Sequence, residues 1–474
     1  MSSQFKCEFE LKQVTPMIHF QSEQKGATLR ATEVKPKLDQ FITELVNRQT
    51  SSDKVSAILD RFCQESESKE LVHTALKSLQ NKDNLNYYLK NADGENHALN
   101  YKLRVNIKSG ENLSGRYPVI KRINNGQQMP VGDYFVVERK SEDKTSFYSS
   151  ANVSIMCFQK GLLKLIEVIF PLFLATTNFG FRQNKGFGHF LVEKCNQSDY
   201  KLNIMQWLID YCDIFEEKYR LYELDICKNS HSAKSYDQMF EQIHLFNQAM
   251  KGGINFREYV PSFILKSYSK KLESGCMNEN EKRYLKSLIV NKRGLTLCDK
   301  NNVPIPVFTV SNENVRYFRG VLGFADHYEF SRVMINDREH RLTFDVQYRT
   351  GDSKKKERKR FSSPLYYLPE LDQSSSINNI QFRKVYILLN KLSVDELIND
   401  HLQAVFSLSK IDKIRSDKYH PPIEIEDKCV KLPSKFDIED FIDSYCKEIN
   451  KEKSRYKSKR ADYKCEKIYV WGAQ

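Results

Sequence analysis

The sequence predicts an α+β fold that opens with a ferredoxin-like (RRM-like) domain. Two patterns support this prediction: short segments in which apolar and polar residues alternate, as in half-buried strands, and longer segments whose apolar residues recur with helical spacing. Over about the first 195 residues these segments follow the order strand, helix, strand, strand, helix, strand. That order is typical of an antiparallel sheet with its helices on one face.

The first half of this domain alternates clearly. A strand is predicted over Phe5–Val14, where four apolar residues alternate with four charged ones. A helix follows, with Thr32 as its candidate cap and Pro36 in its first turn. Residues 49–98 are polar and helical in character, and Tyr101–Ile107 alternates again as the second strand.

The second half of the domain contains a strongly apolar helix. Residues 110–132 are predicted as a loop-rich excursion, and Val153–Phe158 as a strand buried on both faces. The apolar helix Gly161–Thr176 comes next. A glycine-rich loop, Asn178–Phe190, then leads into the last strand, Phe190–Glu193.

The rest of the chain is less regular. Tyr200–Val290 is predicted to be mostly helical, with one of its helices ending at Gly252–Gly253. The strands predicted beyond it are Val303–Val310, Val315–Phe324, Arg341–Arg349 and Phe382–Leu389, and an amphipathic helix is predicted over Phe436–Ile449. We therefore divide the chain into an N-terminal domain (1–198), a mostly helical region (199–295) and a second, partly ferredoxin-like domain with a basic tail (296–474).

Composition excludes several classes of protein. Hydrophobic residues make up 40% of the chain, which excludes a wholly disordered protein. The best candidate membrane span, Leu162–Ala175, is shorter than the about 20 residues a span needs, and it contains Lys164 and Glu167. The charged N-terminus does not look like a signal peptide, and the 11 cysteines include no CxxC pair. We therefore expect a cytoplasmic protein with free thiols, no bound metal and no membrane contact.

The charge favours a polyanionic partner. The chain carries 74 Lys and Arg against 61 Asp and Glu, a net charge of +13, with a pI near 9.0. Two basic runs, Lys354–Arg360 and Lys451–Arg460, each contain six bases and one acid. Solvated loops or frayed helix ends explain such runs about equally well. Most of the aromatic residues must be core, and a minority could stack on unpaired bases.

The loop around Phe181–Phe190 carries the most specific signal. Gly180, Gly186 and Gly188 are interspersed with basic and amide residues. Glycines let a backbone approach a bulky anion and expose N–H groups, and an RNA backbone fits such a loop. The segment is not a Walker loop, because it lacks GxxxxGK[ST], and not a Rossmann fingerprint, because it leads to a strand. A glycine-rich turn without a binding role is the alternative.

At these residues the chain resembles the RAMP proteins of type III CRISPR effector complexes. Their signature is a loop of the type G-x-R-x-x-K/R-G-x-G before the last strand of a ferredoxin-like domain, and Gly180–Gly188 reads GFRQNKGFG. The segments TPMIHF and GATLRATEVKPKLDQFI look like the opening of the same family. Within the family, the chain resembles the first RAMP subunit of the Cmr-type (III-B) complex. The later VRYFRGVLGFADHYEF and RKRFSSPLYYLPE look like that subunit's second half.

The resemblance implies both a fold and a function. It implies tandem ferredoxin-like RAMP domains with a helical insertion. It also implies a non-catalytic subunit that holds guide RNA and its target near the guide 3′ end, for antiviral defence. The implied partners are guide (CRISPR) RNA, target RNA, other RAMP subunits and the large polymerase-like subunit, with no cofactor. The predicted RNA-binding residues are His19, Lys25, Arg30, Lys35, Lys37, Arg182, Asn184, Lys185, Gly186, Gly188, Lys354, Lys355, Lys356 and Arg358.

Two other functions stay open at this point. Some RAMP relatives cut RNA, and His19 could act as the general base of a metal-independent endoribonuclease that processes guide RNA. Packing or phosphate contact is the simpler interpretation of His19, and RNA contact or a buried hydrogen bond that of His189. Asp39 is interpreted as a solvated helix charge. The second alternative is a scaffold whose basic surface meets an acidic protein.

Overall fold

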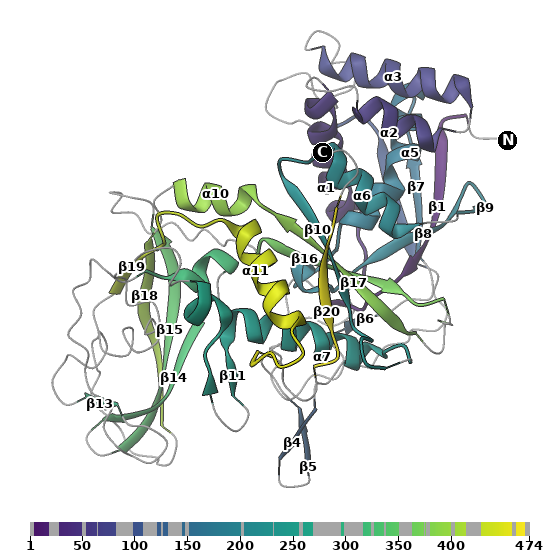
Figure 1. The fold of residues 1–474 in the computed structure, drawn as a ribbon. Coiled ribbons are helices and arrows are strands. Elements are labelled where there is room, and N and C mark those ends of the chain that lie inside the picture. Colours follow the sequence, from purple (N-terminus) through teal and green to yellow (C-terminus); the bar gives the residue numbers. More distant parts are fainter. Residues whose placement is uncertain are drawn as a thin grey trace. The chain divides into compact units, whose positions relative to one another are not determined.

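A computed structural model shows how these segments are arranged (Figure 1). It describes residues 4–18, 28–49, 54–63, 65–81, 98–107, 121–124, 127–130, 145–146, 151–200, 203–230, 232–255, 259–268, 295–297, 316–323, 327–335, 338–349, 363–373, 375, 380–399, 403–413, 428–456 and 461–469. Two compact units are present: unit 1 (1–244, 366–389 and 462–474) and unit 2 (245–365 and 390–461). The predicted division at residues 198 and 295 stays a prediction, because compact units do not show which parts fold on their own.

The first sheet of unit 1 has the ferredoxin-like strand order. Its strands lie in the order β3-β7-β1-β8-β9, and neighbouring strands are antiparallel. The bounds are Lys6–Gln13 for β1, Lys102–Ile107 for β3, Ala151–Met156 for β7, Phe190–Cys195 for β8 and Ser198–Asp199 for β9. Because β1 lies between β7 and β8, the predicted βαββαβ topology is confirmed.

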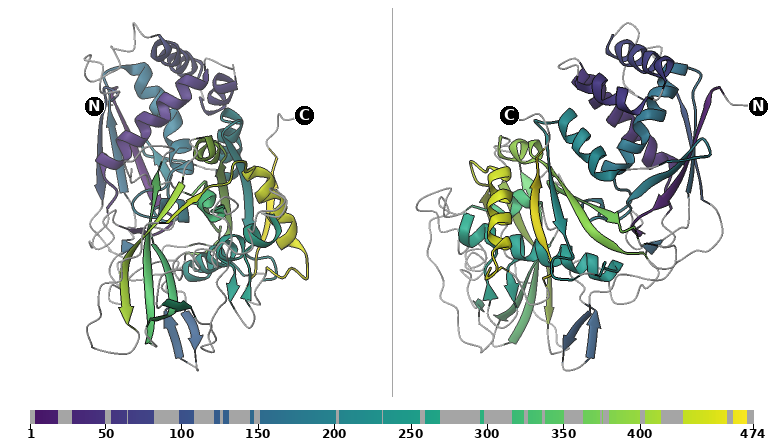
Figure 2. Two further views of the ribbon diagram at one scale, coloured as in Figure 1. Left: turned by 90° about the vertical axis from the view of Figure 1, so that its left-hand side faces the viewer. Right: turned by 45° about the vertical axis from the view of Figure 1, so that its right-hand side comes forward.

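Helices cover one face of this sheet (Figures 1 and 2). They are α1 (Ala31–Gln49), α2 (Lys54–Phe62), α3 (Ser66–Gln80) and α5 (Lys160–Thr176). The rings of Phe9 in β1 and Phe170 in α5 lie 4.4 Å apart in the core between sheet and helices. Thr32 lies inside α1, so it is not the helix cap. The apolar helix α5 is buried as predicted, and no helix among the described residues is long and apolar enough to cross a membrane.

A second sheet in unit 1 joins segments that lie far apart in the sequence (Figure 2, right). Its order is β16-β17-β10-β20. These strands are Leu365–Leu371 (β16), Phe382–Asn390 (β17), Tyr219–Asp225 (β10) and Lys464–Ile468 (β20), and the neighbouring helices in sequence are α6 (Ile204–Ile214) and α7 (Tyr236–Asn247). The predicted strand Phe382–Leu389 is confirmed. The prediction that residues 219–225 are helical is wrong, because β17 and β20 supply hydrogen-bond partners that no local pattern reveals.

Two short strand pairs complete unit 1. β2 (Met17–Ile18) pairs with β6 (Thr145–Ser146), and β4 (Lys121–Asn124) pairs with β5 (Gln127–Pro130). Part of the predicted 110–132 loop is therefore a hairpin. The sequence between β4 and β5 is Asn-Gly, the dipeptide that most favours a two-residue hairpin connection.

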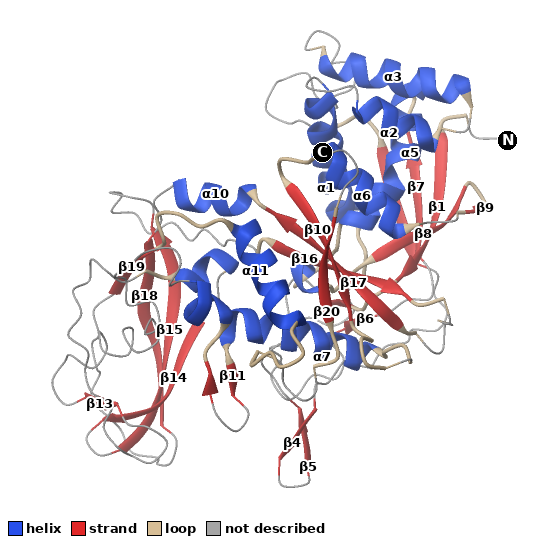
Figure 3. Ribbon diagram, in the orientation of Figure 1, coloured by secondary structure: helices blue, strands red, loops and turns tan. Residues whose placement is uncertain are grey.

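Unit 2 contains a five-stranded antiparallel sheet whose strands neighbour one another in chain order (Figure 3). Its strands are β13 (Leu295–Leu297), β14 (His327–Ile335), β15 (Arg338–Arg349), β18 (Gln403–Lys413) and β19 (Lys428–Lys431). The unit also contains the pair β11 (Ile254–Asn255) and β12 (Tyr259–Val260), the helices α10 (Leu392–Asn399) and α11 (Ile438–Asn450), the π-helical turns Gln248–Gly252 and Ile264–Tyr268, and the 3-10 helix Phe318–Leu322.

The predictions for unit 2 have mixed outcomes. The strand over 341–349 and the helix over 436–449 are confirmed. The strand predicted over Val315–Phe324 is wrong, because 318–322 form a 3-10 helix that ends at Gly323 with a φ of 91°. The strand predicted over Val303–Val310 lies outside the described residues. Two units that both contain sheets and helices fit the expected tandem α+β arrangement.

Candidate nucleic-acid interface

The glycine-rich loop is closed at its base by backbone pairing. Asn178 and His189 form an antiparallel bridge, and the Phe179 N–H donates to the Gly188 carbonyl at 2.9 Å. The chain between them, 180–188, therefore leaves and returns at the same point. Inside it, residues 183–185 form a single 3-10 turn.

The closed loop is attached to the segment that follows β1. The Phe181 N–H donates to the Ile18 carbonyl and the Gly188 N–H to the Pro16 carbonyl, both at 2.9 Å. The carbonyl of His189 accepts from Val14 N–H at 2.8 Å. The N-terminal segment that resembles the opening of the RAMP family thus forms the base of the glycine-rich loop.

This closure requires glycine at two positions. Gly180 has a φ of 81° and Gly188 a φ of 71°, in the left-handed region that favours glycine. A Cβ on Gly180 would lie 2.4 Å from the Ile18 carbonyl oxygen, and one on Gly188 would lie 1.9 Å from that of Phe179. Arg182 also has a positive φ, 59°, directly before the 3-10 turn.

A buried amide–imidazole pair fixes the base of the loop. Asn178 Nδ2 donates to the carbonyls of Gln183 (2.6 Å) and Tyr367 (3.0 Å), so its Oδ1 faces His189 Nδ1 at 2.9 Å as the acceptor. His189 Nδ1 therefore carries the proton. Burial lowers the pKa of His189 to about 3, which leaves the ring neutral near pH 7. The expected buried hydrogen bond of His189 is present.

Lys37 stabilises the loop from the side of α1. Its Nζ donates to the Asn178 carbonyl at 2.8 Å and to Gln183 Oε1 at 2.7 Å. Glu33, one turn earlier, pairs with Lys37 at 3.5 Å, and its Oε1 accepts from Gly180 N–H at 2.6 Å. Burial lowers the pKa of Lys37, and the carboxylate of Glu33 opposes that shift. The ammonium group of Lys37 thus interacts mainly with acceptors inside the protein.

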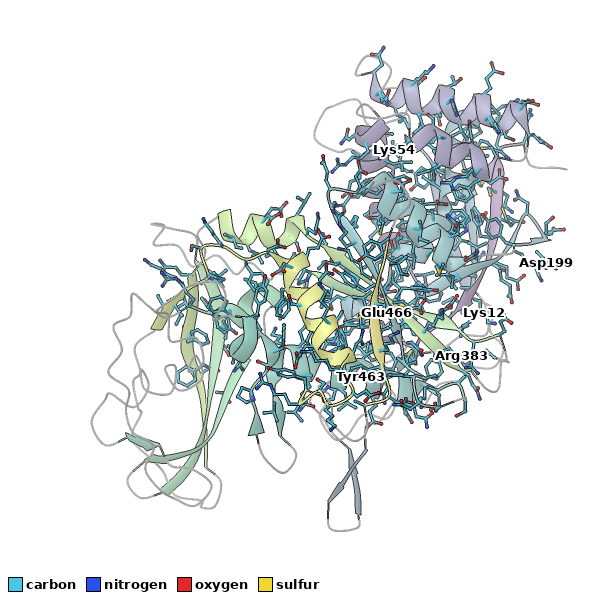
Figure 4. All side chains as sticks on the ribbon, viewed as in Figure 1. Lys12, Lys54, Asp199, Arg383, Tyr463 and Glu466 are labelled. Carbon is cyan, nitrogen blue, oxygen red and sulfur yellow. The ribbon has the colours of Figure 1, made fainter. Side chains whose placement is uncertain are left out.

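The far side of the loop packs against the second sheet and α7. Phe187 is buried and stacks on Phe240 with ring centroids 4.4 Å apart. Gly186 lies beside Tyr367 and Pro369 of β16. A Cβ added to Gly186 would lie 3.4 Å from Pro369 and 3.5 Å from Tyr367, which is ordinary van der Waals contact. The loop is therefore held between both sheets of unit 1. Figure 4 shows Lys12, which lies near the end of β1 that leads toward this loop.

The rim of the loop consists of half-exposed polar residues. Arg182, Gln183, Asn184 and Lys185 are each partly accessible, whereas Gly186 to Phe190 are buried. The guanidinium of Arg182 lies 5.4 Å from the ring centre of Phe181. The loop therefore presents a basic and amide surface on a rigid base.

The structure brings together only some of the predicted residues. The loop gathers Lys37, Arg182, Asn184, Lys185, Gly186 and Gly188, and Arg30 lies half-buried just before α1. His19, Lys25, Lys354, Lys355, Lys356 and Arg358 lie outside the described residues. Of the C-terminal basic run only 451–456 is described, and there Lys451 pairs with Glu448 at 2.6 Å. The RNA contacts themselves stay a prediction.

Lys35 makes its contacts inside the protein, and the interpretation of Asp39 as a solvated helix charge is wrong. Asp39 is 8% exposed, and its Oδ2 accepts from Lys35 Nζ at 2.8 Å. Lys35 also donates to the Leu99 carbonyl at 2.9 Å and lies 4.0 Å above the Tyr101 ring. Asp39 is buried because this part of α1 packs on the start of β3, and its pairing with Lys35 offsets the cost of burial.

Sequence reasoning missed the supporting residues Glu33 and Asn178. Glu33 stands four positions before Lys37, the spacing of a helical ion pair, and that signal was visible in the sequence. Asn178 lies two positions before Gly180. Its contact with Tyr367, 189 positions away, has no local signal in the sequence. Among the described residues, no group of three or more His, Cys, Asp or Glu could hold a metal ion.

Two family models together match most of the chain. The family model described as the Cmr1 N-terminal domain matches residues 4–254, and the one described as the Cmr1 C-terminal domain matches residues 259–467. Among solved structures, the chain is similar to the crystal structure of Cmr1 from Pyrococcus furiosus in its apo form. The two are 9% identical with a TM-score of 0.32, and the match covers 88% of this chain and 92% of that one. A comparison with curated proteins gave no match.

We predict that the two loop glycines differ in their tolerance of alanine. Gly186→Ala adds a Cβ at ordinary contact distance, so it should cost only the left-handed φ, about 1–2 kcal/mol of unfolding free energy. Gly188→Ala should cost more, because its Cβ would collide with the Phe179 carbonyl. Urea unfolding of both variants measures the difference, and equal losses would contradict the closed geometry.

We also predict that His189 makes folding sensitive to acid. Its folded pKa of about 3 lies below the unfolded value of about 6.5, so below pH 6.5 only the unfolded state gains a proton and stability falls. Between pH 7.5 and pH 5 this should amount to about 2 kcal/mol, and His189→Gln should lack that component. The measurement is urea unfolding at both pH values. An NMR titration showing the His189 ring protonated at pH 5 in the folded wild type would refute the prediction.

Proposed function

The chain belongs to the Cmr1 family and is thus a subunit of a type III-B CRISPR effector, and from this premise we propose that it holds guide RNA and its target near the guide 3′ end without cutting either. The observation that carries the proposal is the glycine-rich loop, Gly180–Gly188, whose base is rigid and whose rim is basic. We further propose that it acts in the cytoplasm, with other RAMP subunits and the large polymerase-like subunit as its neighbours.

The loop suits a nucleic-acid backbone for two physical reasons. Its base is fixed by buried bonds, so Arg182 and Lys185 lose little further freedom when they meet phosphates. Phosphate contacts give affinity with little sequence choice, which suits a subunit that must accept any guide.

The predicted RNA-binding residues have different roles in this proposal. Arg182, Asn184 and Lys185 contact phosphates directly. Lys37 acts mainly by positioning the loop, because its ammonium group already donates two short bonds, one to Asn178 at the loop's base and one to Gln183 on its rim. His19, Lys25, Arg30 and the run Lys354–Arg358 are proposed to extend the contact along the RNA.

The non-catalytic assignment is also a proposal. His189, the histidine of the loop, is buried and has a pKa of about 3, which makes it unsuited to proton transfer near pH 7. His19 is the remaining candidate base that the sequence singles out. We propose that it packs or touches phosphate and transfers no proton.

Removing both rim cations should weaken RNA binding in a salt-dependent way. For Arg182→Ala with Lys185→Ala, we expect a loss of about 1–3 kcal/mol of binding free energy. The slope of log K against log[salt] should become shallower by roughly 1–2 units, since two phosphate contacts are lost. Filter binding of single-stranded RNA over a salt series measures both quantities.

Lys37→Met is the comparison variant for that experiment. It should lower affinity by loosening the loop but leave the salt slope close to that of the wild type. Unchanged binding in the rim double variant, at matched salt, would remove the loop from the RNA interface. A Lys37→Met slope as shallow as that of the double variant would make Lys37 a phosphate ligand.

Replacing His19 should leave RNA processing unchanged. We expect His19→Ala to fold and to bind RNA with nearly wild-type affinity, and neither protein to cut a repeat RNA hairpin in EDTA. Gel analysis of the RNA is the measurement. Cleavage by the wild type that the variant lacks would replace this proposal with the endoribonuclease. Purification without RNA, but with an acidic protein, would favour the scaffold.

A further inference from the structure

The end of the first sheet farthest from the glycine-rich loop carries an unusual group of exposed apolar side chains. Phe158 is 82% exposed, Met156 42% and Phe5 37%. The rings of Phe5 and Phe158 lie 5.7 Å apart, and the Cys157 N–H donates to the Phe5 carbonyl, which fixes the two segments together. We call these three residues, with Lys102 and Lys160, the Phe158 patch.

The position of the patch follows from the register of the sheet. Met156 pairs with Lys6 on one side and with Lys102 on the other, so these three side chains lie in one row. The row faces away from the helices, because the next residues, such as Cys7 and Ile155, are buried on the helix side. Met156 and Lys102 therefore lie on the open face of the sheet, whereas Phe5 and Phe158 lie just beyond the ends of β1 and β7, and Lys160 begins α5.

Cations surround the apolar centre. Lys102 and Lys160 are exposed, and Arg104 is exposed in the next row of the same strand. Within the described part of the chain these three residues make no ion pair. Lys6 does pair with Glu8, so its charge is offset. Glu8 shares a row of the sheet with Arg104, whereas Lys102 and Lys160 stand beside the exposed rings without an ion pair among the described residues.

We propose that the Phe158 patch is a second contact for single-stranded RNA, at which an unpaired base stacks on Phe158 and lysines meet the adjoining phosphates. Aromatic platforms beside cations are the usual solution for binding unpaired nucleotides. Protein interfaces are also rich in Phe and Met but poor in Lys, so the lysines favour RNA as the occupant. This inference rests on the proposed function, because it extends the same RNA beyond the glycine-rich loop.

The two contacts lie at opposite ends of β1. The patch lies beside its first residue, Lys6, whereas the loop bonds to Pro16 and Ile18 beyond its last. At about 3.3 Å per residue, the eight residues of β1 separate them by roughly 25 Å. At about 3.4 Å per stacked nucleotide this corresponds to roughly seven nucleotides. A stacked strand of that length would reach both contacts, and a more extended strand would need fewer nucleotides.

The test is a length series of unstructured single-stranded RNA, from about 4 to about 20 nucleotides, bound to the full chain. The wild type should gain affinity as the RNA becomes long enough to reach both contacts, because the second contact becomes intramolecular. Phe158→Ala should reduce affinity for the longest RNA by about 5- to 100-fold and remove most of that gain. Since Phe158 is 82% exposed, the change should not disturb folding.

Tyr469→Ala is the matched control, because Tyr469 is 80% exposed and lies near Lys467. It should leave the length dependence unchanged. An undiminished gain in Phe158→Ala, or an equal loss in both variants, would overturn the inference. So would normal RNA binding by Phe158→Ala combined with failure to join the purified effector complex, which would make the patch a protein interface. The double variant at Arg182 and Lys185 tests the proposed function separately, through the binding of the shortest RNA.

Discussion

The tightest constraint on the closure of the glycine-rich loop is the close approach of Gly188 to the backbone of Phe179. A Cβ at position 188 would lie 1.9 Å from the Phe179 carbonyl oxygen, so only glycine permits the bridge between Asn178 and His189. That bridge sets the geometry of everything attached to it. It places the Asn178 amide at the base of the loop and sets the two ends between which Arg182 and Lys185 lie.

The two lysines of α1 near the loop make contacts inside the protein. Lys35 and Lys37 form ion pairs one helical turn away, with Asp39 and Glu33, and donate to backbone carbonyls. These bonds repay the cost of removing the ammonium groups from water. The rim residues Arg182 and Lys185 are partly accessible to solvent. A rigid internal frame and an accessible charged rim are what a preorganised phosphate site needs.

The first sheet has two functional ends in our proposals. The loop at one end holds phosphates through a fixed backbone, and the Phe158 patch at the other offers a ring for stacking. Neither contact reads sequence strongly, since phosphates and base faces are common to all nucleotides. A subunit that combines them would fix the path of an RNA strand while accepting any guide.

Local patterns in the sequence determined the first sheet and the loop. Alternation in β1 and β3, the apolar helix α5 and the glycines at 180, 186 and 188 depend on neighbours within a few residues, so each is visible in one dimension. The tertiary structure alone decided the rest. Residues 219–225 became a strand because β17 and β20, more than 150 positions away, supplied hydrogen-bond partners. Lys37 became an internal support, and Asp39 a buried acid, because the two faces of α1 meet the loop and β3. Burial and charge pairing arise from contacts between distant segments, and a single sequence carries no record of which segments will meet.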